Sequence, residues 1–225
     1  MTPSDAVKLT LPAIVDAAIA VADRDGIGGL SMRRIADEIG VGAMSLYRHV
    51  ADKDALVVAM AEELGRRFSY PEEGSGDWTW HDRVRIAVDI DWELYRQHPW
   101  VVFAYAAPRY SFGTESLDGL EWLAAGFLDL GVDATRATEM ALTVWNHVNG
   151  VALAGASEQL LNSEPSRDHT SGLAEVIAGR VASARPTLGR LADDPAAGRL
   201  TDPRAILDAG IAALCAGFEA EARGT

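Results

Sequence analysis

Cysteine is almost absent from this chain of 225 residues, with Cys215 as its one example. A single thiol forms neither an intrachain disulfide nor a thiolate metal cluster, so the sequence does not fit a disulfide-stabilised secreted scaffold. The opening stretch, MTPSDAVKLTLPAIVDAA, also lacks the basic segment, apolar core and small-residue cleavage site of a secretory signal. We therefore expect a cytoplasmic protein.

Long uncharged runs are also scarce. The run Met140–Ser157 has 18 residues without a charge, which is near the lower limit for a membrane span. However, Asn146, His147 and Asn149 fall near its middle, where polar groups are expensive in a bilayer. We expect a helix buried inside a protein and no membrane partner.

Motifs of catalysis are missing too. The sequence contains no Gly-x-Ser-x-Gly elbow, no phosphate-binding glycine loop and no His-Glu-x-x-His. Its histidines show no close pairing of the kind that metal sites use. We predict no catalytic residue, no cofactor and no metal ligand, while two alternatives stay open: an all-α enzyme with a fortuitous helix-turn-helix, and an adaptor that binds proteins through its C-terminal helices.

What is present is apolar spacing typical of helices, without the sustained two-residue alternation of strands. The predicted fold class is therefore all-α. Pro12 and Gly26 bound a first helix, Ser31 caps a second that stops at Gly40, and Asp52 caps a fourth. The remaining predicted helices are a third near 43–49 and others near 79–97, 99–106, 114–130, 134–161, 172–184 and 203–222, with loops at 162–172 and 185–203.

The segment 69–78, SYPEEGSGDW, has the composition of a linker. We place a domain boundary there, which predicts an N-terminal helix-turn-helix domain over residues 1–68 and a larger helical domain over residues 69–225. Charge is divided in the same way. The net charge of −13 comes mostly from the second range, because residues 1–68 carry 8 basic and 10 acidic side chains. A small basic surface on an acidic protein is compatible with binding to DNA phosphates.

The turn Gly40-Val41-Gly42 between two predicted helices is typical of a helix-turn-helix. Ala36 is small where the helices would cross, and Leu46 and Val50 would face back toward the second helix. The third helix then presents an outer face that is shaped to enter the major groove of DNA.

The predicted DNA-binding residues divide by chemistry. Phosphate contacts are expected from hydroxyl, imidazole and ammonium groups, whereas base contacts are expected from an arginine that can bind guanine and from small or apolar side chains that meet base edges or thymine methyls. The phosphate set is Ser31, Tyr47, His49 and Lys53, and the base set is Arg33, Ala43, Met44 and Ser45, with Arg48 suited to either.

The segment LSMRRIADEIGVGAMSLYRHVADKDAL (30–56) resembles the DNA-binding domain of the tetracycline-repressor (TetR) family of bacterial transcription regulators. Residues 69–225 resemble the family's ligand domain more loosely, through RQHPW (96–100), Asn149-Gly150 and a final apolar helix. The resemblance implies a repressor that binds double-stranded operator DNA, a small-molecule effector bound in the second domain, and a homodimer formed by that domain.

Aromatic side chains are concentrated after the linker, where they can fill a core or line a pocket. The predicted ligand-binding residues are Trp92, Phe103, Trp145 and Asn149. The helices at 134–161 and 203–222 are predicted to form the dimer contact, with Gly150 and Ala154 allowing close approach and Ile211, Leu214 and Phe218 supplying apolar bulk.

Overall fold

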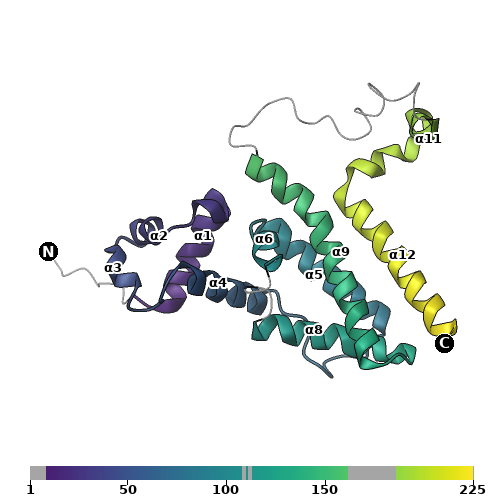
Figure 1. Ribbon diagram of the computed structural model, residues 1–225, viewed down its shortest axis with the longest axis horizontal. Helices are drawn as coiled ribbons and strands as arrows, with labels where there is room; N and C mark the ends of the chain where they lie inside the picture. The colour runs from purple at the N-terminus through teal and green to yellow at the C-terminus, as the bar shows by residue number, and fades with distance from the viewer. Residues whose placement is uncertain (1–8, 108–109, 111–112, 162–185, 225) are drawn as a thin grey trace. The chain divides into compact units, whose positions relative to one another are not determined.

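The computed structural model describes residues 9–107, 110, 113–161 and 186–224, and all regular secondary structure in these residues is helical (Figure 1). The prediction of an all-α protein is confirmed. The elements are α1 (Leu11–Gly29), α2 (Met32–Ile39), α3 (Ala43–Leu46), α4 (Lys53–Arg67), α5 (Trp80–Gln97), α6 (Val101–Tyr105), α8 (Thr114–Phe127), η1 (Leu128–Leu130), α9 (Ala134–Leu161), α11 (Pro186–Gly189), η2 (Arg190–Asp193), η3 (Pro195–Thr201) and α12 (Pro203–Gly224).

The chain forms two compact units. The first comprises residues 1–77 and 89–122, and the second comprises residues 78–88 and 123–225. Helix α5 contributes to both, so the compact units are not the ranges that the linker suggested. The division into a DNA-binding domain over residues 1–68 and an effector-binding and dimerisation domain over residues 69–225 stays a prediction.

In the first unit, local signals set the ends of α1. The Thr10 hydroxyl accepts a hydrogen bond from the Ala13 amide at 3.3 Å, and a proline lies in the first turn. Gly26 interrupts the helix with φ of 70°, a conformation that costs glycine little because it has no Cβ. The apolar face of α1 packs on α4, where Leu56, Met60 and Leu64 are fully buried. These three side chains are spaced four residues apart and form one apolar stripe along α4.

In the second unit, α9 and α12 pack against each other. Met140, Val144 and Val148 of α9 are fully buried, as expected for a helix inside a protein. None of the helices in the described ranges is long and apolar enough to cross a membrane. Phe218 of α12 is also buried and meets the Phe127 ring edge-on at 5.4 Å. Phe218 therefore belongs to the core of its own chain, and its assignment to the dimer contact was wrong.

The expected loop at 185–203 instead contains three short helical elements, α11, η2 and η3. Prolines open α11 and η3, and the Asp194 carboxylate accepts a hydrogen bond from the Ala196 amide at 2.8 Å at the start of η3. The predicted loop 162–172 and helix 172–184 lie outside the described residues.

Candidate nucleic-acid interface

The turn between α2 and α3 has the geometry that the sequence predicted. Gly40 adopts φ of 81°, and the amides of Gly40 and Val41 both donate to the Ala36 carbonyl at 2.9 Å. This arrangement closes α2 with a glycine in the left-handed conformation. Ala36 and Leu46 are buried between the helices, so α3 is held in a fixed orientation. The two helices therefore form a helix-turn-helix.

Helix α3 is shorter than predicted. It ends at Leu46, so Ala43, Met44 and Ser45 lie on the helix, whereas Tyr47, Arg48 and His49 lie on the turn that follows. The Leu46 carbonyl accepts from the amides of both His49 and Val50, which closes the turn and buries Val50 before α4 begins.

Two predicted helix caps flank this region. The Ser31 hydroxyl oxygen accepts from the Arg34 amide at 3.3 Å, and the Asp52 carboxylate accepts from the Ala55 amide at 2.8 Å. Capping uses only the acceptor capacity of Ser31, so its hydroxyl proton remains available to a phosphate. Lys53 is the first residue of α4, directly after the second cap.

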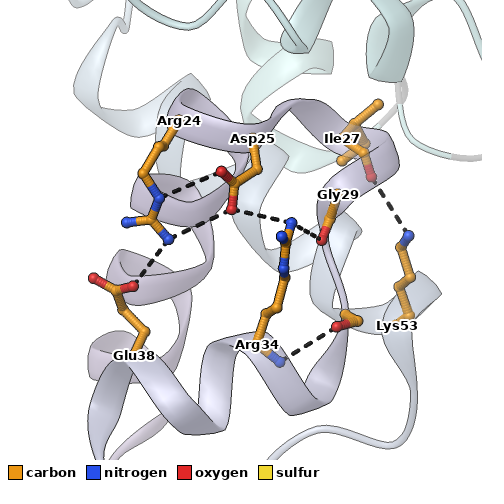
Figure 2. Close-up of polar contacts among 8 residues, drawn as sticks. Arg24, Asp25, Ile27, Gly29, Arg34, Glu38 and Lys53 are labelled. Carbon is orange, nitrogen blue, oxygen red and sulfur yellow. Dashed lines mark hydrogen bonds and ion pairs between the residues drawn. The ribbon is translucent and has the colours of Figure 1, made fainter. Parts of the chain in front are cut away.

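Several cations of the first unit are neutralised by protein groups, as Figure 2 shows for two of them. Arg24 bonds to Glu38 at 3.0 Å and lies 3.4 Å from Asp25. Arg34 lies 3.2 Å from Asp25 and donates to the Gly29 carbonyl at 3.3 Å. Arg34 and Glu38 both remain exposed, and their ion pairs join α2 to α1.

The cations on the predicted DNA-binding surface, unlike Arg24 and Arg34, are not paired with carboxylates in the part of the chain that the structure describes. Within the described ranges, the side chains of Arg33 and Arg48 make neither an ion pair nor a hydrogen bond, and both residues are exposed. Lys53 is also exposed, and its ammonium approaches the Ile27 carbonyl only at 3.5 Å. Met44 is 78% exposed and Tyr47 is 46% exposed, although both carry large apolar groups. We name this set, with Ser31, Ala43, Ser45 and His49, the α2–α3 surface.

The predicted ligand-binding residues are all partly buried. Trp92 and Phe103 belong to the first compact unit, and Trp145 and Asn149 belong to the second. Their assignment to one pocket stays a prediction. A groove of about 450 Å³ in the second unit lies elsewhere, along α5 and α12, and its lining includes His81, Val84, Arg85, Asp208, Ile211 and Cys215.

The Asp91 carboxylate of the first unit was not identified from the sequence. Asp91 accepts hydrogen bonds from the Tyr70 hydroxyl at both of its carboxylate oxygens, at 3.0 and 2.9 Å. Burial raises the pKa of Asp91 to about 7, and the Tyr70 hydrogen bond opposes this shift. Asp89 on the same helix is exposed, whereas Asp91 is partly buried. Only the fold brings Tyr70 to this carboxylate, so no local signal identified it.

Comparison with known proteins agrees with this geometry. Residues 14–60 match the family described as bacterial regulatory proteins, tetR family. An HTH-type transcriptional regulator from Saccharopolyspora erythraea is 30% identical over 214 residues, which cover 95% of this chain and 86% of that protein. The HTH-type transcriptional repressor DrrR1 from Streptomyces coeruleorubidus is 32% identical over 159 residues, which cover 71% of this chain but only 57% of DrrR1.

Solved structures show the same fold along the chain. The Streptomyces coelicolor TetR family protein ActR, in complex with actinorhodin, is 25% identical with a TM-score of 0.75, over 96% of this chain and 97% of ActR. BioQ with its natural double-stranded DNA operator is 25% identical with a TM-score of 0.58, over 68% of this chain and 90% of BioQ. Given the helix-turn-helix, the match of its residues and a relative that is similar over nearly the whole length, this chain belongs to the TetR family of bacterial regulatory proteins.

Proposed function

We propose that this protein is a transcriptional repressor that binds a palindromic operator as a homodimer and leaves it when a small-molecule effector binds. It would act on DNA in the cytoplasm. In this proposal the α2–α3 surface contacts the operator, and residues of the second predicted domain, 69–225, hold the effector and form the dimer.

The main observation in support of DNA binding is a contrast between arginines: within the described residues, some are paired with carboxylates and others are not. A cation that already has a carboxylate partner gains less from a phosphate, because an ion pair worth up to about 1 kcal/mol must be broken first. Arg33 and Arg48 have no carboxylate partner among the described residues and carry no such cost, whereas Arg24 and Arg34 are held by Glu38 and Asp25. The two arginines flank exposed side chains of α3, where Arg33 can bind a guanine and Arg48 can bind either a base or a phosphate.

The homodimer is supported by the size of the recognition element. One α3 of four residues reaches only a few base pairs, so tight and specific binding needs a second copy. Two copies related by a two-fold axis read a palindrome with half-sites about one helical turn apart, or a multiple of that spacing.

The proposal that this protein binds a small-molecule effector is supported by its relatives and by the chemistry of its side chains. ActR is a family member whose structure contains actinorhodin, and the BioQ structure contains operator DNA. In this chain Trp92, Phe103 and Trp145 offer aromatic surface, and Asn149 offers a polar group to orient a ligand. For one ligand to release DNA, it must bind the DNA-free conformation more tightly than the DNA-bound one.

The test is selection of duplexes from a random pool with the full chain, followed by release with actinorhodin as the first probe. We expect recovered sequences to share a palindrome, and a probe that binds the protein to lower operator affinity. Reciprocity requires the operator to weaken probe binding by the same factor. Recovery of no preferred duplex would contradict the proposal and favour an adaptor that binds proteins.

A further inference from the structure

One carboxylate of α1 joins that helix to the corner between α5 and α6. A single oxygen of Asp23, Oδ1, accepts hydrogen bonds from the His98 ring and from the Trp100 indole, each at 2.8 Å. Because an ionised carboxylate only accepts, the His98 Nδ1 must carry the proton. The donors lie 75 and 77 residues from Asp23 along the chain, and all three residues belong to the first compact unit.

The two donors are held by their surroundings. Trp100 is 3% exposed, so its indole N–H has little access to water and depends on Asp23 for a partner. The His98 ring also packs edge-on against Phe68, the C-cap residue of α4, with ring centroids 5.8 Å apart. The corner at residues 98–100 therefore contacts α1 just before its kink at Gly26 and α4 at its C-terminal end.

The neighbours of Asp23 in sequence contact the helix-turn-helix. Arg24 bonds to Glu38 of α2 at 3.0 Å, and Asp25 lies 3.2 Å from Arg34 of α2. Three consecutive residues at the end of α1 thus hold the α5–α6 corner on one side and α2 on the other. A displacement of the corner would move Asp23, and with it the two residues that hold α2.

We propose that Asp23 is a positioning residue that couples the α2–α3 surface to the α5–α6 corner by binding His98 and Trp100 together. This inference rests on the proposed function, because the coupling has a purpose only if the α2–α3 surface binds DNA. This link runs through α1, beside the direct chain connection in which α4 follows the helix-turn-helix. Asp23 itself touches neither DNA nor effector in this account.

The test observes the Trp100 indole N–H by NMR while a duplex from the selection is added to the full chain. The resonance is assigned by its loss in Trp100→Phe. In the wild type we expect duplex binding to shift it, although Trp100 is not part of the α2–α3 surface. In Asp23→Ala we expect the duplex to leave this resonance in place, and in Asp23→Asn, which keeps one oxygen acceptor, we expect part of the shift to return.

The matched control is Asp16→Ala, which removes another carboxylate of α1. Asp16 pairs with Arg67 of α4 and makes no contact with the corner in the described part of the chain. We expect this variant to keep the full shift. An unmoved Trp100 resonance in the duplex-bound wild type, or an equal shift in Asp23→Ala, would overturn the inference while leaving DNA binding intact. Failure of every variant to bind a duplex would instead overturn the proposed function, and the inference with it.

Discussion

The Tyr70 hydroxyl binds both oxygens of the Asp91 carboxylate, yet the pKa of Asp91 is raised to about 7 because burial outweighs this hydrogen bond. An unfolded chain would release the same proton near the ordinary value of 3.8. Between these two pH values the folded chain holds a proton that the unfolded chain has lost. The free energy of unfolding therefore falls as pH rises from about 4 to about 7.

Asp91→Asn should remove this pH dependence, because the amide is neutral and still accepts from Tyr70. We expect the variant to be more stable than the wild type at pH 8 by up to a few kcal/mol, at roughly 1.4 kcal/mol per pKa unit, and close to it at pH 4. Urea unfolding across this range measures the difference. Asp89→Asn, an exposed position on the same helix, is the control, and an equal pH response in both variants would argue against a buried ionisable Asp91.

Met44 should read a thymine methyl group, since it is the second residue of α3 and 78% exposed. Replacing each operator thymine in turn by deoxyuridine removes one methyl group at a time. We expect one such replacement per half-site to weaken wild-type binding several-fold and to have no effect on Met44→Ala. If every replacement acts equally on both proteins, Met44 does not contact a thymine methyl.

Gly150 and Gly155 of α9 provide a matched pair for the dimer contact. Both are exposed, and a Cβ at either position meets no described atom within 4 Å, so neither substitution is strained in one chain. Five residues of helix rotate the two positions by about 140°, so they point to different faces. We expect Gly150→Glu to give monomers in analytical ultracentrifugation and Gly155→Glu to leave the dimer intact. A dimeric Gly150→Glu variant would place the interface elsewhere.

The features that sequence predicted well are local. Ser31 and Asp52 cap their helices, and Gly40 ends α2 in the left-handed conformation, because these residues determine the backbone within a few positions of themselves. The stripe of Leu56, Met60 and Leu64 follows from helical spacing alone. For the same reason the helix-turn-helix and its exposed surface could be inferred before the structure was known.

The features that sequence missed depend on contacts between distant residues. Arg33 and Arg34 are adjacent and chemically identical, but only the fold places Arg34 beside Asp25, while Arg33 has no ion pair with any residue that the structure describes. Asp23 and His98 meet although 75 residues separate them. No spacing rule connects such positions, so the ion pairs, the raised pKa of Asp91 and the core position of Phe218 required the structure.

The most direct test of the DNA-binding account measures operator affinity of Arg33→Ala beside Arg66→Ala and Lys53→Ala, each against a series of single base-pair substitutions. Arg66 is the control because it is exposed but pairs with Glu63 on α4. We expect Arg33→Ala to lose about 1 to 3 kcal/mol on the preferred operator and to lose its preference for guanine at one position per half-site. Lys53→Ala should weaken all sequences alike, and Arg66→Ala should bind as the wild type does. Unchanged affinity and unchanged base preference in Arg33→Ala would contradict the assignment of DNA binding to the α2–α3 surface.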